Sequence, residues 1–371
     1  MLCHNQNIHF SDVVSIWQSL PLIGDDYEAD LLAQFSNSYK NENINKKFAS
    51  RVATHSSKPT APRPKESLLQ PTCAQRIDIF IKSHRLSGGQ MCDALKNPDH
   101  IPLLSQFSRI YPKNFTFQTK AVETSGTNDA VSKRQSSPES FISYVMTQCP
   151  STKERLLIAN FIHEFPDRLL ILEAQQTDIL LCSQCLYNSK FIRYILSWVL
   201  TVGNRLNMGT NFGDAVAFKL DILPRLKDVR SCVGKNKSLM HFLVSKIHQN
   251  EVLVSAIPDV QMLKRASKTC LETLESGVKS LQEDLLMYQA MYKSSFENDE
   301  DDLAHECDTF LNKFAKADVS RITNFTNDTN HAFSRCCKSF CLDRLDSSCS
   351  HLFGSWAAFI EDFQAIMMKL D

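Results

Sequence analysis

The chain has 371 residues, and its 41 basic residues are balanced by 41 acidic ones, so wholesale nucleic-acid binding and a polybasic membrane anchor are not indicated. No apolar run approaches the roughly 18–20 residues that span a bilayer. The N-terminus lacks the basic start and apolar stretch of a signal peptide, so the sequence predicts a cytosolic protein that can bury a large core.

Residues 1–37 are the first predicted part, a short and partly irregular segment with a few large apolar side chains. Its main anchors are Phe10, Trp17, Leu31 and Phe35. Because the segment is too short to make its own core, it must pack on another surface. Aromatic residues dominate interface hot spots, so Trp17 favours docking on a partner, while packing within the same subunit remains open.

Residues 38–71 are polar, basic and interrupted by prolines, with no sustained period. This composition predicts a flexible linker. Its basic residues could meet an acidic partner, although solvation alone explains them. A helical body is then expected over residues 72–371.

The first helix of this body carries one aliphatic residue off its apolar face. Ile77, Phe80 and Ile81 recur at helical spacing on one side, which leaves Ile79 pointing elsewhere. An exposed isoleucine often has no function. A second amphipathic helix follows, and residues 116–137 are expected to form an exposed loop.

Residues 138–200 have a strongly helical pattern, with Pro138, Pro150 and Pro166 at places where helices are expected to begin or end. Further along, apolar residues recur as a heptad seam over about three heptads. The seam comprises Leu274, Val278, Leu281, Leu285, Tyr288 and Tyr292. The acidic run at residues 297–302 is expected to be a solvated loop, and the aromatic stripe near the C-terminus is expected to be core.

The stretch over residues 202–247 concentrates glycine and asparagine in a helical background. The chain has only ten glycines, so their clustering here needs a local reason. Gly203, Asn204, Asn207 and Gly209 predict a specific bend between two helices with a polar, shaped surface. A basic stripe follows, and such stripes are usually solvated. Its members are Arg225, Lys227, Arg230, Lys235 and Lys237.

The sequence contains no recognised catalytic motif for phosphate, dinucleotide, zinc-protease or serine-hydrolase chemistry. His241 lies on an apolar helix face, where a packed histidine is the simpler interpretation. The cysteine clusters at residues 182–185 and 336–349 lack a second ligand pair at finger-like spacing. We therefore expect buried thiols, no metal, no cofactor and no enzyme.

The glycine-rich stretch and the helix after it resemble a known family. GNRLNMGTNFGDAVAFKLDILPRLKDVRS, followed by KSLMHFLV, resembles the signature of the formin homology 2 (FH2) domain, particularly its plant-type variants. IWQSL with Glu28, Leu31 and Phe35 resembles the FH2 "lasso", which wraps around the "post" of a partner subunit. AQRIDIFI resembles the FH2 "knob", with Ile79 at the position that packs on actin.

The resemblance implies an all-α, elongated helical FH2 fold built of lasso, linker, knob, coiled coil and post. It implies a homodimer in which post glycines admit the partner's lasso and post asparagines pair with its backbone. The implied interface residues are Trp17, Phe10, Gly203, Asn204, Asn207 and Gly209. The implied actin-binding residues are Ile79, Arg230, Lys227 and Arg225, with Arg230 at the family's basic position.

The function implied is that of a dimer that nucleates actin filaments and associates with their growing barbed ends in the cytoplasmic cytoskeleton. Two alternatives stay open: a divergent formin that binds or bundles actin without efficient nucleation, and a helical scaffold unrelated to actin. A metal-dependent enzyme is a more distant third. No proline-rich FH1 segment is present, so profilin is expected as a partner only if such a segment exists outside this chain.

Overall fold

The computed structural model describes residues 2–3, 15–35, 71–111, 137–233, 237–296, 299–342 and 347–370. Phe10, residues 38–70 of the expected linker, Lys235 and residues 116–136 of the expected loop lie outside this set. The described chain is all-α, as the sequence predicted, with one pair of short strands. β1 (Leu2–Cys3) pairs antiparallel with β2 (Ala217–Phe218). No described helix is both long enough and apolar enough to cross a membrane.

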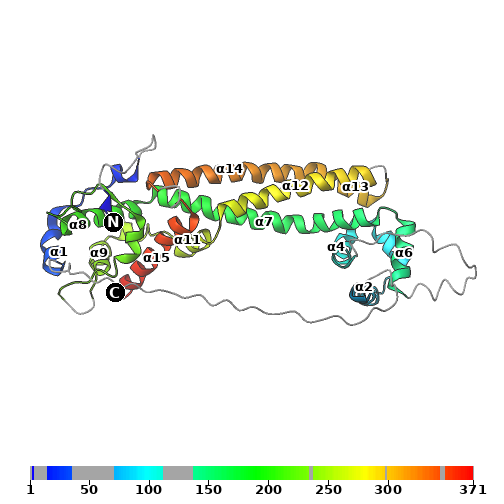
Figure 1. Cartoon of the computed structure of the whole chain (residues 1–371), viewed down its shortest axis with the longest axis horizontal. Coiled ribbons are helices and arrows are strands. Elements are labelled where there is room, and N and C mark those ends of the chain that lie inside the picture. Colours follow the sequence, from blue (N-terminus) through cyan, green and yellow to red (C-terminus); the bar gives the residue numbers. More distant parts are fainter. Residues whose placement is uncertain are drawn as a thin grey trace, which may run out of the picture. The chain divides into compact units, whose positions relative to one another are not determined.

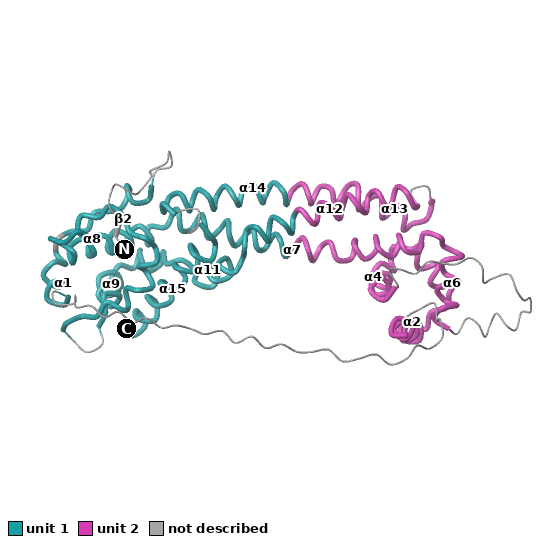
Figure 2. Tube along the Cα trace, in the orientation of Figure 1, with its two compact units in different colours: residues 1–45, 171–278, 322–371 teal, residues 46–170, 279–321 magenta. Residues whose placement is uncertain are grey.

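The chain folds into two compact units (Figure 2). Unit 1 comprises residues 1–45, 171–278 and 322–371, and unit 2 comprises residues 46–170 and 279–321. Three long helices, visible in Figure 1, contribute residues to both units: α7 (Thr152–Asn188), α12 (Leu271–Ser295) and α14 (Ala315–Ser339). The division expected from the sequence is a different one: a segment over residues 1–37, a linker over 38–71 and a helical body over 72–371. It stays a prediction.

Unit 1 gathers its core around the C-terminal helix. Its own elements are the 3-10 helices η2 (Ile16–Ser19), η3 (Asp25–Tyr27) and η6 (Leu220–Arg225), and the α-helices α1 (Glu28–Phe35), α8 (Lys190–Leu206), α9 (Leu239–Ile247), α10 (Glu251–Val254), α11 (Val260–Ser267) and α15 (Cys349–Met367). α15 packs on α11, η6 and α9. Phe353, Phe359 and Phe363 are fully buried there, which confirms that the C-terminal aromatic stripe is core.

Unit 2 holds the helix that carries Ile79. Its own elements are α2 (Pro71–His84), α3 (Gly88–Ala94), the 3-10 helix η4 (Pro98–His100), α4 (Ile101–Ile110), α6 (Pro138–Gln148), α13 (Asp302–Thr309) and a π-helical turn, η7 (Phe310–Phe314). The apolar face of α2 packs on α4 and α6. Phe80 of α2 lies 5.1 Å from Phe107 of α4 between ring centroids, and Phe107 lies 6.2 Å from Phe141 of α6.

The predicted heptad seam of α12 is confirmed. Five of its six members are buried: Leu274, Val278, Leu281, Leu285 and Tyr292. The sixth, Tyr288, stacks on Phe161 of α7 with 4.6 Å between ring centroids. A repeat of 3.5 residues keeps these side chains on one side of the helix, where they meet α7 and the helices after it.

Pro166 does not mark a helix boundary, so that prediction was wrong. α7 runs through it for 37 residues. A proline inside a helix removes one backbone hydrogen bond and costs about 3 kcal/mol. Phe165 and Leu169 on either side are buried, and this packing offsets the cost, because most helix stability in proteins comes from tertiary burial.

Residues 299–302, the described part of the acidic run, are also more than a solvated loop. Asp299 and Asp301 both accept hydrogen bonds from Nη2 of Arg155, each at 2.5 Å. The Arg155 side chain is only 2% exposed. Its Nη1 donates to Leu95 O at 2.8 Å, and its guanidinium lies 4.6 Å from the ring centroid of Phe296. The loop is therefore fastened to the start of α7 inside unit 2.

Candidate functional site

Residues 15–35, hereafter the N-terminal segment, pack on the surface formed by α8, α9 and β2 of the same chain. Ser15 caps η2 by accepting a hydrogen bond from the Trp17 amide. The Trp17 ring meets Phe218 edge-on at a centroid distance of 4.8 Å, and its indole N–H donates to Phe340 O at 3.5 Å. Trp17 is thus held by an apolar contact and a polar one.

Further along the N-terminal segment, two more aromatic side chains continue the contact. Tyr27 packs on Trp198 of α8 at 5.2 Å, and Phe35 packs on Phe242 of α9 at 6.3 Å between ring centroids. All five large anchors of the segment are buried and belong to the core of unit 1. They are Ile16, Trp17, Tyr27, Leu31 and Phe35. Of the two arrangements that the sequence left open, packing within the same subunit is the one present here.

Charged groups align the N-terminal segment on this surface. Glu28 forms an ion pair with Arg205 at the end of α8, and Asp30 pairs with Lys246 of α9 at 2.7 Å. Near the end of the segment, Gln34 O accepts the Cys232 amide at 2.6 Å. These contacts run from α8 to the loop after η6, so the segment crosses the whole surface.

The glycine and asparagine residues after α8 build a closed loop. Asn204 hydrogen-bonds both the N–H and the C=O of Ala215, each at 2.8 Å. Asn207 Nδ2 donates to Gly203 O at 2.6 Å, and Gly209 takes a left-handed backbone with φ +79°. The expected pairing of these asparagines with the backbone of the N-terminal segment has no counterpart among the described residues.

The residues that receive the N-terminal segment were not singled out from the sequence. Trp198, Arg205, Phe218 and Phe242 all lie in or beside the glycine-rich stretch, so the right region was identified. Choosing among its residues required knowing which side of α8 and α9 is uncovered by the rest of unit 1. That depends on contacts between distant parts of the chain, which periodicity does not reveal.

Ile79 is an apolar side chain that projects from α2. It is 58% exposed, whereas Ile77 and Phe80 on the packed face are 0% and 8% exposed. The predicted orientation of Ile79 is therefore confirmed. Beside it, Asp78 and Lys82 form an exposed ion pair at 2.7 Å. The result is an aliphatic projection bordered by charge.

The basic residues Arg225, Lys227 and Arg230 are exposed on unit 1. Arg225 ends η6, and the backbone of Arg230 forms a bridge with Ser238. Lys227 Nζ lies 2.7 Å from Asp362 Oδ2 of α15. The hydrogen bond that Lys227 donates to Asp362, together with the charge of that carboxylate, raises the pKa of Lys227. Ile79 belongs to unit 2, so the candidate actin-binding residues are divided between the units.

Three cysteines of the two clusters, Cys182, Cys337 and Cys349, are buried, and His241 caps a helix. Burial raises the pKa of the Cys182, Cys337 and Cys349 thiols to about 12, which keeps them protonated and unreactive. Among the described residues, no group of three or more His, Cys, Asp or Glu side chains is placed to hold a metal ion. His241 Nδ1 lies 2.9 Å from Ser238 Oγ in the capping box of α9, and burial together with nearby cations lowers its pKa.

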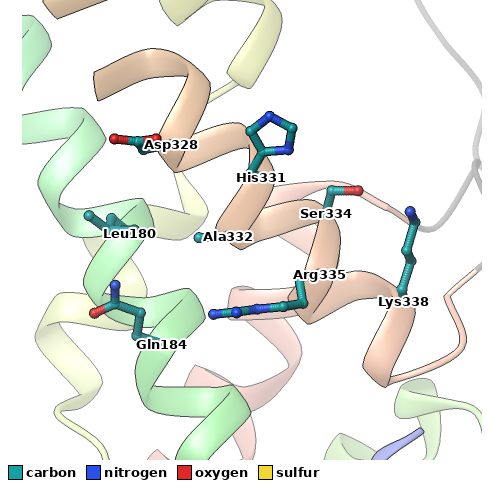
Figure 3. Close-up of a pocket in the computed structure, with 8 residues that line it drawn as sticks. All are labelled: Leu180, Gln184, Asp328, His331, Ala332, Ser334, Arg335 and Lys338. Carbon is teal, nitrogen blue, oxygen red and sulfur yellow. The ribbon is translucent and has the colours of Figure 1, made fainter. Parts of the chain in front are cut away.

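A shallow groove of about 620 Å³ lies between α7 and α14 within unit 1. Figure 3 shows Arg335 extending across it towards Gln184. The Arg335 guanidinium lies 4.9 Å from the ring centroid of Tyr187. None of the residues predicted from the sequence lines this groove, and its open walls, which are partly polar and partly apolar, do not enclose a small molecule.

Comparisons with known proteins agree on one family. The Formin Homology 2 Domain family matches residues 8–364. Disheveled-associated activator of morphogenesis 2 of Gallus gallus is 26% identical over 232 residues, which cover 62% of this chain and 21% of that protein. Formin-like protein 1 of Arabidopsis thaliana is 28% identical over 191 residues, or 52% of this chain and 18% of that protein.

A rice relative gives the same result. Formin-like protein 11 of Oryza sativa subsp. japonica is 30% identical over 186 residues, which cover 50% of this chain and 19% of that protein. The chain spans about a fifth of the length of these three relatives. The match to the family extends over nearly the whole chain, from before Trp17 to beyond Phe363.

Proposed function

Because the chain belongs to the formin homology 2 domain family, we propose that it is an actin-binding domain that dimerises, nucleates filaments and stays on their growing barbed ends. The observation that carries the proposal is the exposure of Ile79. A packed helix has no internal need for an isoleucine that is 58% exposed, and an apolar projection with a charged border suits the centre of a protein interface.

The proposed activity requires binding energy and no bond-making. A dimer that holds actin subunits in a filament-like arrangement stabilises a nucleus that is otherwise scarce. Ile79 supplies an apolar contact with actin, and Arg225 and Arg230 supply electrostatic ones. In this role the protein acts at the cytoskeleton.

The direct test is the assembly of pyrene-labelled actin with the purified chain and with Ile79→Ala. We expect the variant to lose at least about tenfold in barbed-end affinity, since burying an isoleucine contributes about 1.5–3 kcal/mol. Ile171→Ala is the matched control, because Ile171 is 59% exposed on α7. Equal assembly by wild type and Ile79→Ala would rule out Ile79 as the actin contact.

The same assay separates the alternative that a divergent formin binds actin without nucleating it. In this alternative the N-terminal segment stays packed within its own chain, and no segment is exchanged with a partner. Co-sedimentation with filaments but no acceleration of assembly would support it. If the chain does not bind actin at all, the remaining alternative is a helical scaffold whose function is unrelated to actin.

The contact between the N-terminal segment and the rest of unit 1 supports the proposed dimer. Exchange of an identical element between two chains preserves each contact, so Trp17 would meet Phe218 of the second copy in the same way. Residues 36–70 connect the segment to α2, and fully extended they reach about 120 Å. The chain therefore has the length to reach a neighbouring copy.

An isotope experiment shows whether the N-terminal segment packs on a second copy or on its own chain. Carbodiimide joins a carboxylate directly to a nearby amine, and Asp30 lies 2.7 Å from Lys246. Chains with natural nitrogen and chains labelled with heavy nitrogen are mixed, denatured and refolded together. The mixture is treated with carbodiimide, and the masses of the cross-linked peptides are measured by mass spectrometry. We expect mixed-isotope Asp30–Lys246 products. The Lys264–Glu361 pair, at 2.6 Å within the body of unit 1, is the control and must stay within one isotope. Only like-isotope products at both pairs would refute the exchanged dimer.

A further inference from the structure

The basic segment, residues 225–230, begins at the end of η6, which packs on α15. Leu220, Leu223 and Leu226 are buried beneath η6 and the turn that follows it. At the start of η6, Asp221 lies 3.6 Å from His351 near the beginning of α15. Beyond the end of η6, Lys227 pairs with Asp362 near the end of α15.

Two consecutive acidic residues of α15 each bind a lysine from a different element. Asp362 Oδ2 accepts from Lys227 at 2.7 Å, and Glu361 Oε1 accepts from Lys264 of α11 at 2.6 Å. The side chain of Asp362 is 30% exposed, and that of Lys227 is 50% exposed. The ammonium group of Lys227 is thus held by a carboxylate of the same unit.

The turn held by Lys227 has its own backbone hydrogen bonds. The Asp228 amide donates to Arg225 O at 2.9 Å, and Val229 O accepts the Leu239 amide at 2.8 Å. Arg225 and Arg230 lie at the two ends of this turn, and both are exposed. Lys227 therefore lies in the same hydrogen-bonded turn as both arginines.

We propose that Lys227 is an internal latch and that Asp362 is a positioning residue, which together aim Arg225 and Arg230 at actin. The inference rests on the proposed function and revises it at one position, because Lys227 was itself an expected actin contact. A partly exposed ion pair contributes at most about 1 kcal/mol, so the latch sets the orientation of the turn and adds little to the stability of unit 1.

Replacement of Asp362 by asparagine tests the proposal by the sign of its effect. If Lys227 is a latch, Asp362→Asn loosens the turn and weakens barbed-end binding by up to about fivefold. If Lys227 touches actin, the same substitution frees its ammonium and strengthens binding. Glu361→Gln is the matched control, since it removes one negative charge from the adjacent position and should leave binding unchanged.

A charge exchange gives the second arm. The double variant Lys227→Asp with Asp362→Lys rebuilds the ion pair in reverse and should restore binding, because paired sites are not additive. Failure of this variant, combined with tighter binding by Asp362→Asn, would overturn the latch.

Hydrogen exchange of the Asp228 amide tests, in the absence of actin, whether the Lys227–Asp362 pair holds the turn. We expect Asp362→Asn to accelerate exchange at this amide and the charge exchange to restore its protection. Unchanged exchange in Asp362→Asn would sink the latch even if actin binding is seen. Accelerated exchange in a chain that does not bind actin would instead count against the proposed function alone.

Discussion

At the scale of single residues, Arg155 is a buried cation of unit 2 with several hydrogen-bond partners. All of its nitrogens donate hydrogen bonds: Nε to Ser151, Nη1 to Leu95 O and Asp301, and Nη2 to Asp299 and Asp301. Burial alone would raise the pKa of Asp301, but the hydrogen bonds and charge of Arg155 and the Ala304 amide outweigh it and lower that pKa. Asp301 is therefore ionised at neutral pH, and its negative charge balances the buried guanidinium of Arg155.

We predict that Arg155→Met lowers the free energy of unfolding of the chain by about 3–5 kcal/mol, because it removes the hydrogen bonds from Arg155 to Asp301 and Leu95 O and leaves the Asp301 carboxylate without its cation. Denaturant unfolding followed by circular dichroism measures the change. Arg168→Met is the control: Arg168 and Asp284 form a half-exposed pair at 2.7 Å, for which about 0–1 kcal/mol is expected. Equal losses in the two variants would contradict a special position for Arg155.

At the scale of elements, α7 retains a proline in its interior. Pro166 is exposed, so its ring contributes little packing, and its position requires the loss of a helical hydrogen bond. We predict that Pro166→Ala stabilises the chain, by up to about 3 kcal/mol. Thermal unfolding measures it. Pro138→Ala should give no such gain, since Pro138 occupies the first turn of α6, where the missing N–H has no partner to lose.

The elements also show which features the sequence could reveal. The heptad seam of α12 and the exposure of Ile79 were predictable because both follow from repeats within a single helix. The partners of Arg155 stand 144 and 146 residues away, and Trp17 donates to a carbonyl 323 residues away. No local pattern identifies such partners. Pro166 misled for the same reason, because burial on both sides of it outweighs the local preference.

At the scale of the whole molecule, the proposed dimer contact and the proposed actin contact differ in chemistry. The N-terminal segment buries five large apolar side chains, each contributing about 1.5–3 kcal/mol. Its ion pairs, Glu28–Arg205 and Asp30–Lys246, are partly exposed and contribute at most about 1 kcal/mol each. The expected actin contact combines one apolar side chain, Ile79, with the exposed charges of Arg225 and Arg230.

This difference predicts separate responses to salt. Raising the ionic strength from about 0.05 M to about 0.5 M shortens the Debye length from about 14 Å to about 4 Å and screens exposed charges. We expect the dimer dissociation constant, measured by sedimentation equilibrium, to change by less than about tenfold, because apolar burial does not weaken with salt. Barbed-end affinity should fall more steeply over the same range. A dimer that dissociates with the same salt dependence as actin binding would mean that its ion pairs, and not Trp17 and its apolar neighbours, hold the two copies together.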